Sequence, residues 1–256
     1  MEKISLRVDE ASVRFGGLVA LDRVSLEAFA GEVHGVIGPN GAGKTTLFNV
    51  ICGFVKPNSG SLNFMGQQVQ GLKPEKLTRL GIARTLQGLG LFSRMTVLEN
   101  VMIGANALAK VGSLRSFFGA GASIREEAKL TKMALDTIDR LGLGQYAQRL
   151  PPSLPYAVQK KVALARSLVL DPKFLLLDEP ASGLSDDEMA ELGDLIVHLT
   201  RELGIVLVEH HMDLVMRVCT KITVLDFGRV IADGSPSEIK NNPLVTEAYL
   251  GEEVNN

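Results

Sequence analysis

The sequence predicts an α/β fold whose core is interrupted by a helical segment and then resumes. Three observations lead to this prediction. A glycine-rich octet at residues 38–45 lies between a strand-like and a helix-like segment. From about residue 96 to residue 167, the apolar residues recur with helical spacing. After residue 173, short apolar runs typical of buried strands alternate with a helical pattern.

Composition is that of an ordinary globular protein. The chain has 256 residues, of which 46% are hydrophobic and 22% charged, enough for a sizeable core. With a net charge of −2 and a pI near 6.1, no nucleic-acid partner is expected. No apolar run approaches the ~20 residues of a membrane helix, and the first residues do not resemble a signal peptide. Cys52 and Cys219 lack metal-ligand spacing and are expected to be reduced core residues.

Turn residues and apolar periodicity define the expected elements before the helical segment. Gly16-Gly17 marks a turn between two strands, and Gly53 and Pro57 end the helix that follows the octet. The expected elements are strands at 3–8, 24–30, 32–37 and 60–65 and helices at 45–52 and 75–80.

The same signals define the later elements. Gly142 ends one amphipathic helix, and Asp171-Pro172 ends another. A turn at Asp226-Phe227-Gly228 joins the strands of a final hairpin. The expected elements are helices at 133–141, 160–170 and 187–202 and strands at 174–177, 205–208, 222–225 and 229–232.

The octet fits the phosphate-loop pattern G-x-x-x-x-G-K-[ST] at every fixed position. Glycines let backbone N–H groups turn toward a phosphate without interference from a Cβ atom. Lys44 would reach the β- and γ-phosphates and the Thr45 hydroxyl would ligate Mg²⁺, at a helix N-terminus that favours anions. The alternative is a glycine-rich turn with an unrelated lysine. The pattern predicts an ATP site formed by Gly38, Pro39, Asn40, Gly41, Ala42, Gly43, Lys44, Thr45 and Thr46.

Two adjacent carboxylates end a later apolar strand. Asp178 and Glu179 follow the run at 174–177, and side chains alternate along a strand, so the two should have different roles. Behind a phosphate loop, Asp178 would hold Mg²⁺, and Glu179 would orient and polarise the attacking water. The alternative is a pair of surface acids at a strand end.

Together these motifs resemble the ATP-binding subunits of ABC transporters over nearly the whole chain. The resemblance implies a P-loop NTPase fold of the ABC ATPase type: a RecA-like core with an antiparallel β edge and an inserted α-helical subdomain. It implies that Phe15 stacks on adenine, that Gln87 in the Q-loop touches Mg²⁺ and a membrane subunit, and that His210 contacts the γ-phosphate. The alternatives are a core aromatic at Phe15 and a hydrogen-bonded strand-end histidine at His210. His211 stands where the family often has aspartate.

The resemblance also implies a domain organisation. The nucleotide-binding domain would cover residues 3–251, with its core at about 3–92 and 168–240, its helical subdomain at about 93–167 and a short tail at 241–256. Three segments, at 15–21, 84–100 and 242–251, resemble the branched-chain amino acid transporter ATPases. Residues 106–123 resemble an insertion in those subunits, in which Phe117-Phe118 faces either a membrane-side surface or its own helices.

One motif departs from the family. Leu154-Pro155-Tyr156-Ala157-Val158 stands where the family usually has its signature, Leu-Ser-Gly-Gly-Gln. The serine hydroxyl is missing, Pro155 lacks a backbone N–H, and Ala157 adds a methyl where a phosphate must approach. Ser185, in the D-loop, stands where many members have Asp or Asn. In the family's head-to-tail dimer, these two motifs act on the partner's ATP, whereas every motif that acts in cis is intact.

The sequence therefore predicts an ATP-hydrolysing importer subunit at the cytoplasmic face of the cell membrane. Its expected partners are membrane permeases, bound through the Q-loop region, and a second, different ATPase subunit, with a periplasmic or extracellular solute-binding protein acting indirectly. Branched-chain or related amino acids are the expected solute, although urea fits the same type of ATPase. A regulatory nucleotide-binding subunit with little hydrolysis is the alternative. A soluble phosphate-loop kinase is disfavoured, because nothing supplies an acceptor-substrate site.

Overall fold

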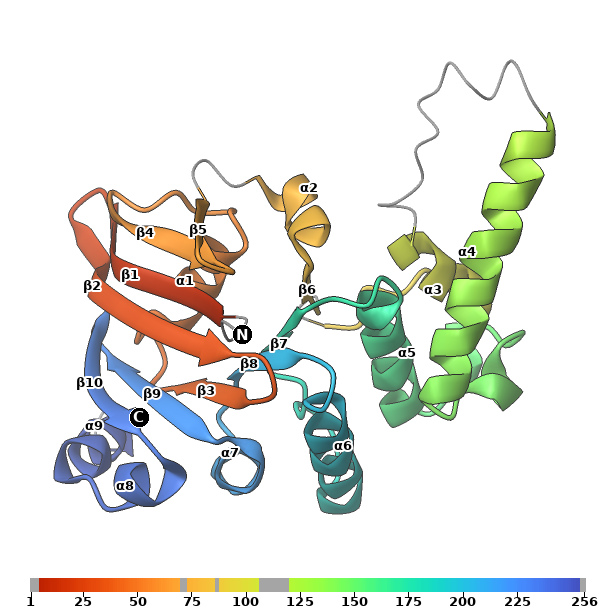
Figure 1. The fold of residues 1–256 in the computed structure, drawn as a ribbon. Helices are drawn as coiled ribbons and strands as arrows, with labels where there is room; N and C mark the ends of the chain where they lie inside the picture. Colours follow the sequence, from red (N-terminus) through yellow and green to blue (C-terminus); the bar gives the residue numbers. More distant parts are fainter. Residues whose placement is uncertain (1–4, 70–72, 86–87, 106–119, 254–256) are drawn as a thin grey trace. The chain divides into compact units, whose positions relative to one another are not determined.

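The computed structural model describes residues 5–69, 73–85, 88–105 and 120–253 (Figure 1). The chain divides into two compact units, one made of residues 1–82 and 173–256 and the other of residues 83–172. Apart from β6 (Ile82–Arg84), which crosses the boundary, the strands of the described residues belong to the first unit.

The first sheet is antiparallel, with the strand order β2-β1-β4-β5. The strands expected at 3–8 and 24–30 are parts of longer strands, because bulges at Glu10 and Arg23 shift the alternation of buried side chains. These two residues have left-handed φ values of 44° and 53°, and their N–H groups donate to the hydroxyls of Ser25 and Ser12 across the hairpin. The strands are β1 (Ser5–Phe15), β2 (Leu18–Phe29), β4 (Ser59–Phe64) and β5 (Gln67–Val69).

The second sheet is mainly parallel, with the strand order β10-β9-β3-β8-β7-β6. β3 (Val33–Ile37), β7 (Phe174–Asp178) and β8 (Gly204–Val208) are buried at every position, as their mainly apolar sequences predict. β9 (Lys221–Asp226) runs parallel to β3 and antiparallel to β10 (Arg229–Gly234), which confirms the final hairpin. Because β3, β8 and β7 are adjacent and parallel, their carboxyl ends lie side by side at one edge of the sheet.

Helix α1 (Lys44–Ile51) joins the two sheets. Its side chains Leu47, Phe48 and Ile51 are fully buried in one apolar cluster, which also contains residues of β1, β2 and β4 from one sheet and of β3, β7 and β8 from the other. Burying an apolar side chain of this size contributes roughly 1.5–3 kcal/mol. The helix that leaves the octet is therefore held firmly against both sheets.

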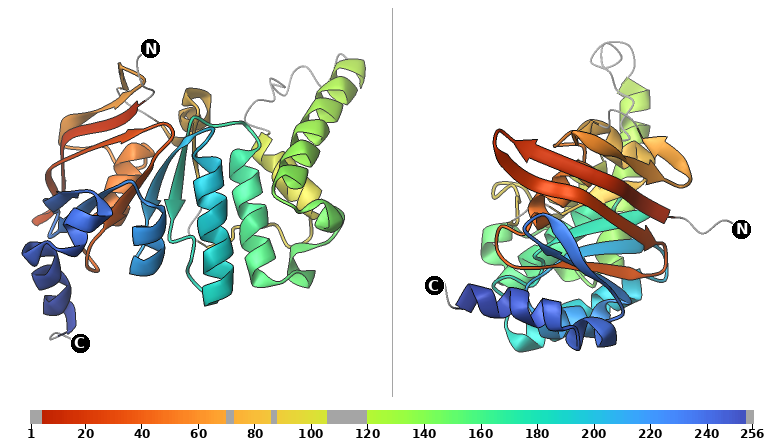
Figure 2. Two further views of the ribbon diagram at one scale, coloured as in Figure 1. Left: turned by 60° about the horizontal axis from the view of Figure 1, so that its bottom comes forward. Right: turned by 90° about the vertical axis from the view of Figure 1, so that its left-hand side faces the viewer.

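Shorter helices cover the rest of the first unit. α6 (Asp186–Leu199) packs against α7 (Met212–Val218), and both α8 (Pro236–Lys240) and α9 (Pro243–Glu253) pack against β10 (Figures 1 and 2). The helix expected at 75–80 is a short α-helix, α2 (Pro74–Leu77), followed by one 3₁₀ turn at Thr78–Leu80. α7, α8 and α9 were not among the elements that periodicity predicts.

The described part of the segment at 96–167 is mainly helical, as its periodicity predicts. α3 (Val97–Ala105) packs against α4 (Ala120–Arg140) and α5 (Tyr156–Leu168) (Figure 2), and 3₁₀ turns lie at Gly144–Tyr146 and Pro151–Ser153. The buried side chain of Asn100 donates to the carbonyls of Phe92, Met95 and Thr96 and accepts from the Phe92 N–H, which organises the loop before α3. No helix in the described part of the chain is both long enough and apolar enough to span a membrane.

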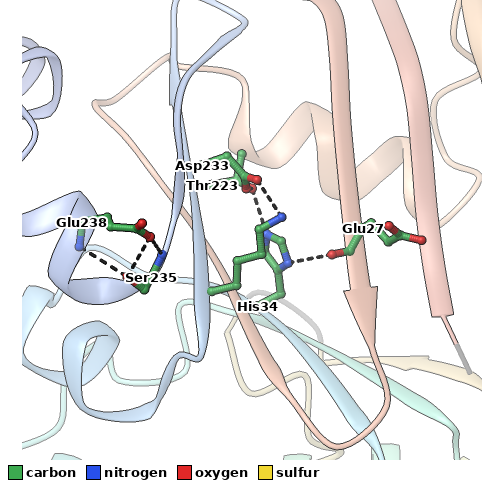
Figure 3. A network of polar contacts seen from close by, with 7 residues as sticks. Glu27, His34, Thr223, Asp233, Ser235 and Glu238 are labelled. Carbon is green, nitrogen blue, oxygen red and sulfur yellow. Dashed lines mark hydrogen bonds and ion pairs between the residues drawn. The ribbon is translucent and has the colours of Figure 1, made fainter. Parts of the chain in front are cut away.

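A chain of polar contacts runs from buried His34 in β3 to the surface of the first unit (Figure 3). Nδ1 of His34 lies 3.1 Å from the carbonyl oxygen of Glu27, and Nε2 lies 2.8 Å from the hydroxyl of Thr223. That hydroxyl donates to Asp233, whose other carboxylate oxygen is 2.6 Å from Nζ of Lys221. Burial lowers the pKa of His34 from 6.5 to about 4, although the Asp233 charge opposes that effect.

The lowered pKa of His34 predicts that the fold weakens between pH 6.5 and about 4. In this range the unfolded chain binds a proton at His34 and the folded chain does not, so acid favours unfolding, whereas above pH 6.5 the contribution is constant. The two pKa values correspond to a loss on the order of 3 kcal/mol. This loss of stability is measured by urea unfolding of the wild type and of His34→Gln at several pH values. The variant should show a clearly smaller loss over this range, and equal losses would contradict the assignment.

Candidate functional site

Apart from Phe15, the predicted site residues of the first unit stand at the ends of three neighbouring parallel strands or directly after them. In the ladder, Val36 of β3 lies beside Val208 of β8, which lies beside Asp178 of β7. The octet follows β3, the two acids stand at the end of β7, and the histidines follow β8. In open α/β sheets, ligands bind outside the carboxyl ends of the strands. This edge therefore brings together the phosphate loop, the acids and the histidines.

The octet forms a close turn that only glycine allows at two positions. Gly38 has a φ of 146°, and a Cβ atom there would lie 2.0 Å from the carbonyl oxygen of Leu225. Gly43 has a φ of 106°, and its Cβ would lie 2.7 Å from the carbonyl oxygen of Ala20. The two glycines therefore let the loop pack closely against β9 and β2.

Lys44 is the first residue of α1, and its ammonium group lies over the loop. Nζ donates to the carbonyl oxygens of Gly38 and Pro39 at 2.6 and 2.7 Å. A cation is thus held beside N–H groups at the start of α1 that have no partner within the helix. Around it, Thr45, Asn40 and Gly41 are exposed, Thr46 is half-buried, and Pro39 and Ala42 are buried.

The two acids at the end of β7 have different surroundings. Asp178 is the last residue of the strand and is 6% exposed, whereas Glu179 is half-buried and has left the strand. Glu179 has a φ of 47°, a left-handed backbone that is uncommon outside glycine, and its N–H donates to the carbonyl of Val208 at 2.9 Å. The two carboxylates thus lie in different environments, because the chain leaves the strand at Glu179 and not because side chains alternate along it.

The residues after β8 include one that sequence reasoning missed. His210 is exposed and His211 half-buried, with their ring centroids 4.3 Å apart. Glu209, just before them, is 1% exposed. Its carboxylate accepts hydrogen bonds from the N–H groups of Ala181, His210 and His211. Glu209, His210 and His211 could together offer a metal ion three ligand atoms within 4.8 Å, but these N–H groups already occupy the buried carboxylate.

The structure describes only some of the remaining predicted residues. Phe15 ends β1 at the turn into β2 and is 52% exposed, so its ring is available for stacking rather than buried in the core. Gln87 lies outside the described residues, and so does Phe117-Phe118. Of the resembling insertion at 106–123, only the last four residues are described, as the beginning of α4.

Comparison with known families agrees with this arrangement. A model described as ABC transporter matches residues 21–182, which is more than half of the chain. This chain belongs to the ABC transporter family. A second model, described as branched-chain amino acid ATP-binding cassette transporter, matches residues 229–255, which include β10, α8 and α9 of this ABC protein.

Relatives of this ABC protein match it from end to end. The high-affinity branched-chain amino acid transport ATP-binding protein LivG of Salmonella typhimurium is 40% identical over 98% of this chain and 100% of its own. The corresponding protein BraF of Pseudomonas aeruginosa is 38% identical with the same coverage. The chain is thus an ATP-binding subunit of the ABC transporter type, as its motifs predict.

Solved structures of ABC cassettes confirm the predicted fold class. A nucleotide-free ATP-binding cassette of an ABC transporter is 31% identical, with a TM-score of 0.84 over 96% of this chain and 98% of its own. Another cassette, solved in its ADP conformation, is 30% identical, with a TM-score of 0.85 over 98% of this chain and 100% of its own. The second of these structures shows that a cassette of this fold accommodates a nucleotide.

The departing signature of this ABC protein lies at the start of α5. Pro155 is the N-cap residue, with φ −54° and ψ 150°, and no side chain caps the helix. The carbonyl of Pro155 accepts from the N–H of Gln159, whose side chain donates to the carbonyl of Leu154. The helix therefore begins normally despite the changed sequence. The side chains at the start of the helix do change, because Tyr156 is exposed and Pro155, directly before it, carries no hydroxyl.

The D-loop residue Ser185 has a structural role of its own. It is the N-cap of α6, where its hydroxyl accepts from the Glu188 N–H and the Glu188 carboxylate accepts from the Ser185 N–H. Asp and Asn cap helices as well as Ser does. The change at this position therefore preserves the cap of α6.

Proposed function

We propose that this chain is an ATP-hydrolysing subunit of an ABC importer. The observation that carries the proposal is the gathering of the phosphate loop, the two acids and the histidines at the carboxyl edge of β3, β8 and β7. The loop suits a triphosphate, because Gly38 and Gly43 allow its tight turn and Lys44 supplies a cation beside helix N–H groups.

Each residue has a proposed role. The backbone of residues 38–46 and the ammonium of Lys44 bind the phosphates, and the exposed ring of Phe15 stacks on adenine. Thr45, Gln87 and Asp178 would hold Mg²⁺, which when bound neutralises charge between the β- and γ-phosphates. The carboxylate of Glu179 takes a proton from the attacking water, and His210 orients the γ-phosphate.

The transported solute and the partners follow from the relatives. LivG and BraF are named as branched-chain amino acid transport ATP-binding proteins, which favours a branched-chain amino acid as the solute of this importer. The chain would then lie at the cytoplasmic face of the membrane, bound to permeases through the region of Gln87. A solute-binding protein on the other side would deliver the amino acid.

The second ATPase subunit is proposed to be a different chain. Leu154–Val158 offers no serine hydroxyl, and Pro155 offers no N–H, so a site closed by this segment loses bonds to the γ-phosphate. Hydrogen bonds to charged groups contribute about 1.5–3 kcal/mol each. The productive site would therefore combine this chain's phosphate loop and Glu179 with an intact signature from the partner.

The test uses the transporter purified with its permeases and second ATPase subunit, in liposomes with leucine and the solute-binding protein. We expect ATP-dependent leucine uptake and hydrolysis, with little hydrolysis by this chain alone. The Glu-to-Gln change is then placed in each ATPase subunit separately. If the change in this chain leaves the complex nearly fully active while the partner's change stops it, this chain is instead the regulatory subunit. Brisk hydrolysis by this chain alone would show that its own signature is competent.

A further inference from the structure

The carboxylate of Glu209 joins two loops of the candidate site. Oε1 accepts from the N–H of Ala181 at 2.7 Å, and Oε2 accepts from the N–H groups of His210 and His211 at 3.0 and 3.3 Å. Ala181 belongs to the loop after β7, and the histidines belong to the loop after β8. One buried side chain therefore binds main-chain donors from both loops.

Only a carboxylate satisfies this arrangement. Three N–H groups converge on a side chain that is 1% exposed, so water cannot replace a lost acceptor. An ionised carboxylate has two acceptor oxygens and no hydrogen, whereas an amide has one acceptor and turns an NH₂ group toward the remaining donors. Bonds from N–H groups to an ionised acceptor are also stronger than neutral ones.

The residues that Glu209 holds in place are those with proposed chemical roles. Glu179 stands two residues before Ala181, and its own N–H donates to Val208, so a second hydrogen bond ties the same loop to the end of β8. On the other side, Nδ1 of His210 lies 3.7 Å from Oε2 of Glu209. Contacts of the Glu209 carboxylate therefore link the loop of Glu179 to the loop of His210.

We propose that Glu209 is a positioning residue for ATP hydrolysis. Its carboxylate holds the loop of Glu179 and the loop of His210 in one arrangement, while touching no reacting atom itself. The inference rests on the proposed function, because it requires that Glu179 and His210 act on ATP. Small displacements of a reacting group lower rates steeply, by up to about 10²-fold for 1 Å.

The decisive variant is Glu209→Gln, which keeps the size of the side chain and removes its charge. In the complete transporter we expect kcat to fall at least about tenfold, equal to about 1.4 kcal/mol of activation free energy. The Kd for ATP should stay within about twofold of the wild-type value, because binding depends on the phosphate loop. A general loss of structure would change both quantities together.

Two further variants separate positioning from simple destabilisation. Val206→Ala removes buried methyl groups from β8, the strand that precedes Glu209, without touching the carboxylate. It should therefore lower the unfolding temperature and leave kcat unchanged at low temperature. In a Glu179→Gln background, Glu209→Gln should cost much less than it does alone, since the group it positions no longer acts as a base.

The outcomes are distinct. A kcat within twofold of wild type for Glu209→Gln, an equal fall for Val206→Ala, or an undiminished effect in the Glu179→Gln background overturns the inference while the ATPase activity stands. A wild-type transporter that does not hydrolyse ATP overturns the proposed function, and this inference with it.

Discussion

Glu179→Gln should leave ATP binding intact and slow ATP turnover by about 10²–10⁴-fold, the typical contribution of a general base. The charge of the carboxylate polarises the attacking water and accepts its proton. Glutamine has the same length and can still form a hydrogen bond, but it lacks the basicity. Both side chains would sit on the same left-handed backbone with a φ of 47°, so the comparison isolates the chemistry.

The measurement is steady-state ATP hydrolysis by the complete transporter, together with an ATP titration of the same sample. Glu191→Gln is the matched control, because it makes the same chemical change on the exposed side of α6 and should retain the wild-type rate. Hydrolysis by Glu179→Gln at the wild-type rate would show that another group activates the water.

Lys44→Ala should abolish detectable ATP binding at low nucleotide concentration. The ammonium of Lys44 lies over the loop, within 2.6–2.7 Å of two loop carbonyls, where it can reach a terminal phosphate. Alanine removes that cation from a site whose other donors are neutral N–H groups. Binding is followed by titration of a fluorescent ATP analogue with Mg²⁺ present.

Lys56→Ala is the control for this experiment, since Lys56 is an exposed lysine in the loop after the same helix. It removes one positive charge from the first unit and should bind nucleotide as the wild type does. Circular dichroism of both variants checks that the loss of the Lys44 bonds has not unfolded α1. Equal ATP affinity for Lys44→Ala and the wild type would exclude the octet as the phosphate site.

The central strands could be predicted from the sequence because one physical rule determines them. β3, β7 and β8 are buried on both faces, so their sequences are mainly apolar, with His34 in β3 and Asp178 at the end of β7 as the polar exceptions. β1 and β2 were predicted too short, since the bulges at Glu10 and Arg23 depend on serine hydroxyls from the opposite strand. No pattern within one strand indicates that contact.

The site was predictable where its residues form a local motif. The octet and the pair of acids were found from their spacing, and His210 and Phe15 from the family resemblance. Glu209 was missed because its role depends on Ala181, 28 residues earlier in the chain. Three consecutive polar residues after β8 do not reveal which of them turns inward. Gln87 remains a prediction, since it lies outside the described residues.

The left-handed backbone of Glu179 has a consequence for attempts to engineer this protein. A residue with a side chain in that conformation costs roughly 1–3 kcal/mol, whereas glycine adopts it freely. Replacing Glu179 by glycine should therefore relax the backbone while removing the proposed base. Selection for heat resistance alone would favour such a change, as trade-offs between stability and activity commonly arise at strained active-site positions. Thermostable variants of this chain should therefore also be assayed for ATP hydrolysis, and the residue at position 179 should be checked in each of them.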